Sequence, residues 1–129
     1  MMRVLIFGTF DHLHPGHIFV LTEATKKGDV TVIIARDENV ERIKGHLPSQ
    51  SESERAQSIK KLFPAVTVLL GDPEDFLAPV HSVHPDLILL GYDQNLPPGV
   101  SEKDLHCPVE RLPAFKPEMF KSSKRAKVT

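Results

Sequence analysis

The stretch that decides the fold lies near the N-terminus, where residues 3–17 read RVLIFGTFDHLHPGH. Residues 3–8 form a short apolar run that ends at a glycine, which is typical of a buried strand. Pro15 suits the first turn of a helix, and a helical pattern continues from there to Lys27. The stretch therefore predicts a buried strand, a loop and a helix, in that order.

The same alternation continues along the rest of the chain. In the first predicted helix Ile18, Leu21 and Ala24, together with Val20, fit one face, which we expect to be buried. The pattern then predicts strands at residues 29–36, 65–71, 86–91 and 108–112, helices at 38–44, 51–63 and 73–83, and a loop at 95–103.

Near-continuous apolar strands that alternate with helices are typical of a parallel sheet covered on both faces. Right-handed crossovers then make the sheet doubly wound. We predict an α/β fold in which residues 1–129 form a single Rossmann-like domain on a five-stranded parallel sheet. Because ligands bind at the carboxyl ends of such strands, the site is expected in the segments that follow Gly8, Arg36, Gly91 and Leu112.

Composition excludes several classes of protein. Of 129 residues, 40% are hydrophobic and 26% are charged, as in an ordinary soluble globular domain. No apolar run approaches the roughly 20 residues that a membrane span needs, so we expect no membrane partner. The only cysteine, Cys107, excludes an internal disulfide and a multi-cysteine zinc site, and a reducing cytoplasm is the expected location.

The formal net charge of −1 conceals an uneven distribution. Residues 116–129 hold five cations and one anion, whereas residues 1–115 hold 11 cations and 16 anions. Because the two parts of the chain have opposite net charge, the charge distribution does not indicate nucleic acid as a partner. We interpret residues 116–129 as a basic C-terminal segment that lies close to an anionic ligand.

The loop after the first predicted strand carries the residues best suited to bind phosphate. His14 and His17 share a face of the first helical turn, and Gly16 between them leaves the backbone open to a ligand. A helix N-terminus adds free N–H groups and a positive dipole end, to which imidazoles add further donors. The two histidines alone fit surface caps or an incidental metal site equally well. Their place directly after a glycine-ended strand favours a polyphosphate.

Residues 8–11 (GTFD) followed by residues 14–17 (HPGH) resemble the GTFD…HxGH signature of the cytidylyltransferase-like nucleotidyltransferases. This superfamily includes glycerol-3-phosphate cytidylyltransferase, phosphopantetheine adenylyltransferase and archaeal-type FAD synthases. The resemblance covers essentially the whole chain.

Three later segments add to the resemblance. Residues 35–38 (ARDE) with Lys44 and Gly45 resemble the segment that carries a phosphate-binding lysine, and residues 91–94 (GYDQ) resemble the nucleotide-base loop. Residues 116–124 (KPEMFKSSK) lie where the family has a second signature, RTxGIST, and match it only in part. Together the segments look most like those of archaeal-type FAD synthases.

The resemblance implies a nucleotidyltransferase, in which an acceptor phosphate attacks the α-phosphorus of ATP or CTP and expels pyrophosphate. It implies that His14, His17 and Lys44 are catalytic, and that Mg²⁺ accompanies the triphosphate on phosphate oxygens and waters. Asp11 is the candidate protein contact of that ion, with helix capping as the alternative. The residues expected to bind the nucleotide and its phosphates are Gly8, Thr9, Phe10, Gly16, Gly91, Asp93, Lys121, Ser122 and Ser123.

The acceptor is less constrained than the reaction. FMN, giving FAD, is our preferred interpretation; glycerol 3-phosphate or another small alcohol phosphate with CTP is one alternative, and a non-catalytic nucleotide-binding module is another. Family resemblance alone makes a homodimer plausible. A flavin needs an apolar slot, which would be lined by Pro97, Pro98, Phe115, Met119 and Phe120.

Other side chains receive plainer interpretations. Ser51 and Glu54 match a capping box at the start of the helix predicted at 51–63. Arg55, in the same helix, is interpreted as part of a solvated face rather than as a phosphate ligand. Asp93 either accepts from a base or is a turn residue, and Tyr92 either stacks on a base or flavin or packs below its loop. His46, His81, His84 and His106 are taken as ordinary surface or loop residues.

Overall fold

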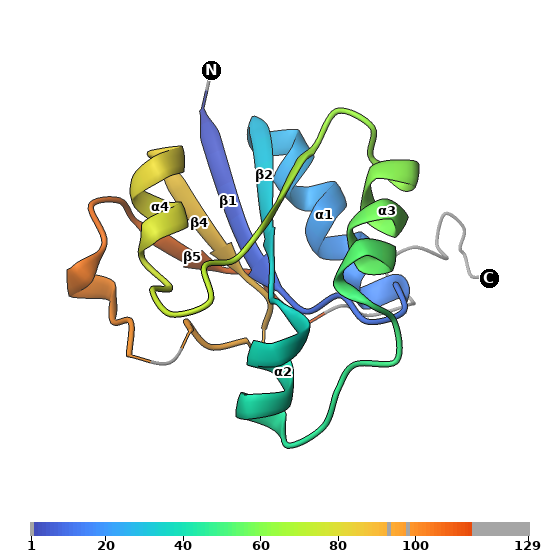
Figure 1. The fold of residues 1–129 in the computed structure, drawn as a ribbon. Coiled ribbons are helices and arrows are strands. Elements are labelled where there is room, and N and C mark those ends of the chain that lie inside the picture. Colours follow the sequence, from blue (N-terminus) through green and yellow to red (C-terminus); the bar gives the residue numbers. More distant parts are fainter. Residues whose placement is uncertain (1, 93, 98, 115–129) are drawn as a thin grey trace.

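The computed structural model describes residues 2–92, 94–97 and 99–114, and these residues form a parallel sheet flanked by helices (Figure 1). The predicted doubly wound α/β fold on a five-stranded parallel sheet is confirmed. The strands are β1 (Arg3–Gly8), β2 (Asp29–Ile34), β3 (Thr67–Leu70), β4 (Leu87–Leu90) and β5 (Val109–Arg111). The helices are α1 (Pro15–Lys27), α2 (Asp37–Lys44), α3 (Glu52–Leu62) and α4 (Ala78–Val83), with a 3₁₀ turn at Glu102–Asp104.

The strand order is β3-β2-β1-β4-β5. The chain runs from β1 through β2 to β3 at one edge, then crosses to β4 on the other side of β1 and continues to β5, so the order reverses between the neighbouring strands β1 and β4. Gly8 at the end of β1 pairs with Ile34 at the end of β2, and Ile6 pairs with Leu89 of β4. The carboxyl ends of these strands therefore meet at one edge, where α2 also lies (Figure 1). A ligand site is expected at this point of a doubly wound sheet.

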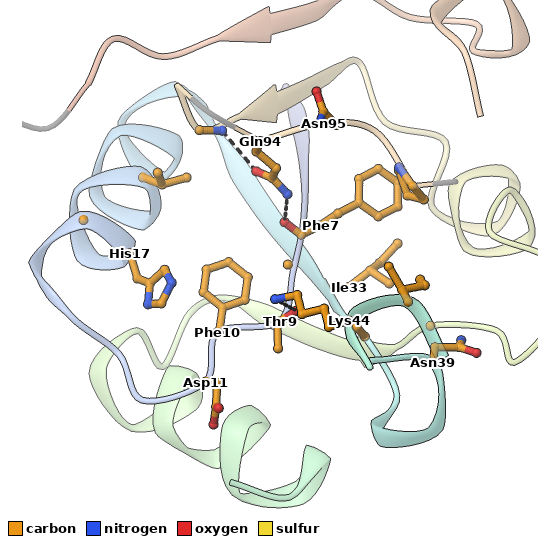
Figure 2. Close-up of a pocket in the computed structure, with 18 of the residues that line it drawn as sticks. Phe7, Thr9, Phe10, Asp11, His17, Ile33, Asn39, Lys44, Gln94 and Asn95 are labelled. Atoms are coloured by element: carbon orange, nitrogen blue, oxygen red, sulfur yellow. Dashed lines mark hydrogen bonds between the residues drawn. The ribbon is translucent and has the colours of Figure 1, made fainter. Parts of the chain in front are cut away.

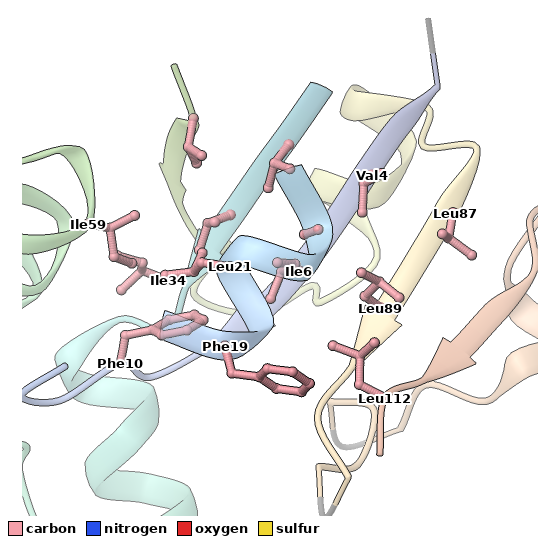
Figure 3. Packing of buried hydrophobic residues seen from close by; sticks show 14 residues of the cluster. Val4, Ile6, Phe10, Phe19, Leu21, Ile34, Ile59, Leu87, Leu89 and Leu112 are labelled. Atoms are coloured by element: carbon pink, nitrogen blue, oxygen red, sulfur yellow. The ribbon is translucent and has the colours of Figure 1, made fainter. Parts of the chain in front are cut away.

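Alternate residues of the strands fill the two layers of the core. Val4 and Ile6 face α1 and α3 and pack in one cluster with Leu21 and Ile59 (Figure 3). Leu5 and its alternate neighbours face the other way and pack in a second cluster with Val80 of α4. This period of two is the strand geometry that the apolar runs predicted.

The structure corrects the buried face of α1. Ile18 is 38% exposed, whereas Phe19 is 7% exposed and packs in the core cluster that also contains Leu112. The prediction held for Leu21 and Ala24 but was wrong for Ile18, because the helix turns its largest apolar side chain toward the sheet.

The structure also shortens α4, which begins at Ala78 rather than at residue 73. The Asp72 carboxylate accepts from the backbone N–H groups of Glu74 and Asp75, at 2.9 and 2.8 Å. The Asp75 carboxylate accepts from the N–H of Leu77 at 2.9 Å. Because these side chains take the backbone donors of residues 74, 75 and 77, the segment forms turns instead of a first helical turn.

The other predicted elements are present, with ends that differ by one or two residues. The loop predicted at 95–103 contains the start of the 3₁₀ turn. No helix of the described residues has the length and apolar character required to cross a membrane.

Candidate active site

A cavity of about 790 Å³ opens at the carboxyl edge of the sheet (Figure 2). All four segments predicted from the sheet rule contribute to its wall, and a fifth segment, after β3, was not predicted. The same rule would have found it, because β3 is parallel to β2 and its carboxyl end reaches the same edge. Predicted site residues in the wall are Gly8, Thr9, Phe10, Asp11, His14, Gly16, His17, Lys44 and Gly91. The predicted residues Asp93, Lys121, Ser122 and Ser123 lie outside the described residues.

His14 and His17 form a reciprocal cap at the start of α1. The Nδ1 atom of His14 accepts from the N–H of Gly16 at 3.1 Å, and the Nδ1 atom of His17 accepts from the N–H of His14 at 3.4 Å. The two rings are stacked, with centroids 3.7 Å apart. An imidazole that accepts through Nδ1 carries its proton on Nε2 when neutral. Both rings therefore keep an Nε2–H donor for a ligand at the helix start.

His17 is held in the neutral form. Burial, with the neighbouring charges of His14 and Lys44, lowers the pKa of His17 to about 4. The Phe10 ring contacts the His17 ring edge to face, with centroids 5.2 Å apart. Near pH 7 this side chain is therefore a fixed hydrogen-bond donor rather than a second cation beside Lys44.

Lys44 reaches the phosphate loop from the end of α2. Its Nζ atom donates to the Oγ1 atom of Thr9 at 3.4 Å (Figure 2). Gly45 ends α2 in the left-handed conformation, with φ of 84°, and its N–H donates to Glu41 at 2.8 Å. The structure thus brings together Thr9 and Lys44, which are 35 residues apart in sequence.

Two glycines of the signature have no room for a side chain. A Cβ atom on Gly8 would lie 2.4 Å from the Phe10 ring, and one on Gly16 would lie 2.9 Å from the His14 ring. Gly16 therefore permits the imidazole cap, and Gly8 permits the turn by which Phe10 returns beneath the loop.

The backbone of the loop between β1 and α1 is strained, and the loop is held by hydrogen bonds with the segment that precedes α3. Phe10 and His12 have φ of 54° and 55°, a region that non-glycine residues rarely adopt. The Gln50 side chain accepts from the N–H of His12 at 2.9 Å. The Asp11 carboxylate accepts from the N–H groups of Ser49 and Gln50, each at 2.8 Å. The segment before α3 therefore fixes this loop.

Asp11 does not cap α1, and its contact with a metal ion stays a prediction. The helix cap is His14, and both Asp11 carboxylate oxygens have backbone partners. Burial would raise the pKa of Asp11, but the N–H groups of Ser49 and Gln50 outweigh it and hold the pKa below its usual value. In the described part of the chain, no three His, Cys, Asp or Glu side chains come together as a metal site.

The interpretation of Arg55 as part of a solvated face was wrong. Its side chain is fully buried and donates to the backbone oxygens of Thr9 and Gln50 and to the Asp37 carboxylate. The signal in the sequence was its spacing, because Arg55 lies four residues before the buried Ile59 and so shares its face of α3.

The loop after β4 is fastened by two side chains that sequence reasoning missed. Gln94 accepts from the N–H of Gly91 at 3.0 Å and donates to the oxygen of Phe7 at 2.5 Å (Figure 2). Arg111 donates to the backbone oxygens of Gly91, Tyr92 and Gln94. Tyr92 is 58% exposed and lines the cavity, so it does not pack below the loop.

One wall of the cavity is largely apolar. Its side chains come from β1, β2, α2, the segment between β3 and α4, and α4 itself, and include Phe7, Ile33, Ile43, Phe76 and Pro79. Asn39 adds a buried polar group, whose Nδ2 donates to the backbone oxygen of Asp72 at 3.3 Å and whose Oδ1 has no partner among the described residues. Of the residues predicted to form an apolar slot, Pro97 lines the cavity, and Pro98, Phe115, Met119 and Phe120 lie outside the described residues.

Comparison with known proteins agrees with this geometry. The family model described as cytidylyltransferase-like matches residues 5–126. The chain is 39% identical to a protein named FAD synthase from Methanosphaerula palustris, over 97% of this chain and 84% of that protein. It is 41% identical to an FAD synthase from Methanosarcina barkeri, over 90% of this chain and 86% of that protein.

A solved structure shares the fold. The crystal structure of a protein from Thermoplasma volcanium, described as a lipopolysaccharide core biosynthesis protein, superposes with a TM-score of 0.77 at 32% identity. The match covers 90% of this chain and 99% of that protein. With the signature histidines at the start of α1 and the family model over most of the chain, this chain belongs to the cytidylyltransferase-like family and is a nucleotidyltransferase.

Proposed function

We propose that this chain is an FAD synthase, which transfers the adenylyl group of ATP to FMN and releases pyrophosphate. The observation that carries the proposal is the cavity, in which a helix start suited to phosphate faces an apolar wall. The similarity to proteins named FAD synthase over most of the chain supports the same acceptor and the same nucleotide.

The reaction needs no nucleophilic side chain. An oxygen of the FMN phosphate attacks the α-phosphorus of ATP and forms a new P–O bond, while the bond from the α-phosphorus to the bridging oxygen breaks. Pyrophosphate leaves with the electron pair of that bond. The protein has to align two anions and stabilise the charge that gathers on the transferred phosphoryl group and the leaving group.

The described residues that would do this lie at the start of α1. His14 and His17 donate through Nε2–H to the phosphate oxygens, and the start of α1 adds the positive end of the helix dipole. α1 has no acidic residue in its first turn, so nothing there repels the triphosphate. Lys44 approaches from the other side of Thr9 as a point charge for the β- and γ-phosphates or the acceptor phosphate.

A magnesium ion on the triphosphate is part of the proposal. The described residues do not form a resident metal site, because no three ligating side chains meet. Asp11 stays the candidate protein contact, since each of its carboxylate oxygens accepts only one backbone N–H. We therefore assign the ion to the phosphate oxygens and water and derive no catalytic step from it.

The apolar wall favours a flavin over a small alcohol phosphate. An isoalloxazine ring buries a large apolar surface, for which Phe7, Ile33 and Phe76 provide matching contacts. Glycerol 3-phosphate would leave the same wall in contact with water, at a cost proportional to its apolar area.

The predictions about residues outside the described part of the chain, and about domain, oligomeric state and location, also remain proposals. We propose that Asp93 faces the base and that Lys121, Ser122 and Ser123, in the basic segment 116–129, close over the triphosphate. A single domain over residues 1–129, a homodimer and a cytoplasmic location are expectations from the resemblance, the chain length and the single cysteine.

A pyrophosphate-release screen tests the proposal. It crosses ATP, CTP, GTP and UTP with FMN, glycerol 3-phosphate, phosphocholine and 4′-phosphopantetheine, and uses a His14→Ala/His17→Ala double variant as the blank. We expect the highest kcat/KM for ATP with FMN. Turnover with a small phosphomonoester and none with FMN would overturn the acceptor. ATP binding by calorimetry without pyrophosphate release for any pair would identify a nucleotide-binding module instead.

A further inference from the structure

The Arg55 guanidinium contacts three separate segments of the chain. Nη1 donates to the oxygen of Thr9 at 2.8 Å, Nη2 to the Oδ1 atom of Asp37 at 2.6 Å, and Nε to the oxygen of Gln50 at 3.2 Å. The side chain is 0% exposed. A buried cation with three directed bonds fixes the positions of its partners as well as its own.

Two of these partners, Thr9 and Asp37, belong to the two segments that bring Lys44 to the phosphate site. Thr9 is the residue whose hydroxyl contacts Lys44, and Asp37 is the first residue of the helix that ends at Lys44. One guanidinium therefore bonds to the backbone of the phosphate loop and to the start of the helix that delivers the lysine. A tilt of α2 at Asp37 would be carried along the rigid helix to Lys44.

Asp37 is held from a second direction by the same helix that carries Arg55. The N–H of Asp37 donates to Glu52 at 2.9 Å, and the N–H of Glu52 donates to the Oδ2 atom of Asp37 at 3.2 Å. Arg55 occupies the remaining oxygen, Oδ1. The planar fork of arginine reaches all three of its partners at once, whereas lysine would keep the charge without that geometry.

The loop that Arg55 supports needs such a restraint. Phe10 follows Thr9 directly and has a left-handed φ of 54°, which a free loop would relax. The bond to the oxygen of Thr9 lies at the entry to this strained turn.

We propose that Arg55 is a positioning residue of the transfer reaction, which holds the phosphate loop and α2 in register so that Lys44 meets the phosphates. This inference rests on the proposed function for its substrates but assigns a role to a side chain that does not face the cavity. Misplacement of a catalytic group by about 1 Å costs up to roughly 100-fold in rate.

The test is a double-mutant cycle between Arg55 and Lys44. We expect Arg55→Lys to lower kcat by roughly 10- to 100-fold while KM changes much less, because the substrate contacts remain and their alignment is lost. In a Lys44→Ala background the same substitution should have little further effect, since the group that it positions is absent. Asp37→Asn, which keeps the size of the partner, should reproduce the loss and its dependence on Lys44.

Ile59→Val in the same helix is the matched control, because it removes a buried methylene from α3 away from the network. Circular dichroism and thermal unfolding identify any variant that fails to fold, in which case Asp37→Asn carries the cycle. ATP affinity by calorimetry should change much less than kcat, because the substrate contacts remain and only their alignment is lost. Wild-type kcat for Arg55→Lys, or an equal loss with and without Lys44, would overturn the inference. Absent turnover of the wild type with FMN would instead count against the proposed function.

Discussion

Two helices on the same face of the sheet, α1 and α3, begin with the same reciprocal cap built from different chemistry (Figure 1). In α3 the Ser51 hydroxyl accepts from the N–H of Glu54 at 3.2 Å, and the Glu54 carboxylate accepts from the N–H of Ser51 at 2.9 Å. In α1 two imidazoles fill these positions, through the Nδ1 atoms of His14 and His17.

The difference explains why only one helix start suits a phosphate site. The first turn of α3 contains Glu52 and Glu54, so its positive end is already neutralised by carboxylates. The first turn of α1 contains no acidic residue, and each imidazole that caps the helix through Nδ1 keeps Nε2–H for a ligand. A cap and a phosphate site can thus share the same two side chains when both are histidines.

The largest loss of activity is expected when the imidazole cap of α1 is given a carboxylate like the one in the cap of α3. His17→Glu retains a side chain that caps the helix but places a carboxylate where the triphosphate should bind. We expect pyrophosphate release to fall by more than about 10³-fold, because a donor is lost and a repulsive charge is added. The reciprocal change, Glu54→His in α3, should leave turnover unchanged. Comparable losses in both variants would show that the two caps do not differ in function.

Removing one imidazole should have a smaller effect. We expect His14→Ala to lower kcat by about 10²- to 10³-fold, as for the loss of one donor to a developing negative charge. The same variant should lose about 1 kcal/mol of unfolding free energy, because the cap of α1 is lost. Steady-state kinetics and urea denaturation measure the two losses. A loss of unfolding free energy with a kcat close to that of the wild type would show that His14 caps the helix and does not contribute to catalysis.

The matched substitution in α3 should affect stability alone. Ser51→Ala is expected to lower the free energy of unfolding by about 1 kcal/mol, similar to the structural part of His14→Ala. Its kcat should equal that of the wild type, because Ser51 caps a helix whose start does not line the cavity. A loss of turnover as large as that of His14→Ala would contradict the comparison.

The smallest effect concerns pH. Since the pKa of His17 is about 4 in the folded chain, below its ordinary value of 6.5, the unfolded chain binds the extra proton first on acidification. The contribution of His17 to stability is therefore complete above pH 6.5 and decreases as pH falls from 6.5 toward 4. We expect NMR titration of the His17 ring to give a midpoint near 4, and the stability difference between wild type and His17→Asn to change across this window. A midpoint at or above 6.5 would contradict the neutral donor assigned to His17.

The sequence was sufficient to predict the sheet and one side of the cavity, for local reasons. Runs such as residues 3–8 are apolar and short, and the glycine that ends them marks the carboxyl edge of a parallel strand. The pairing of His14 with His17 depends on a spacing of three residues, which a helix converts into contact without help from distant parts of the chain.

The features that were missed depend on contacts distant in sequence or on side chains that compete with the backbone. Arg55 was interpreted as solvated because charged residues usually are, and its partners Thr9 and Asp37 come from two other segments. The bond from Gln94 to Phe7 spans 87 residues and has no local signature. The side chains of Asp72 and Asp75 accept hydrogen bonds from backbone N–H groups, so turns form where the first turn of α4 was predicted. The spacing of apolar residues does not indicate this competition.

The most direct test of the account follows the α-phosphate itself. Wild type and His17→Glu are incubated with FMN and ATP labelled at the α-phosphorus, and the products are separated by chromatography. The account predicts labelled FAD in an amount equal to the pyrophosphate released by the wild type, and essentially none from His17→Glu. Label that stays in ATP or appears as AMP in the wild type, or labelled FAD formed equally by both proteins, would contradict it.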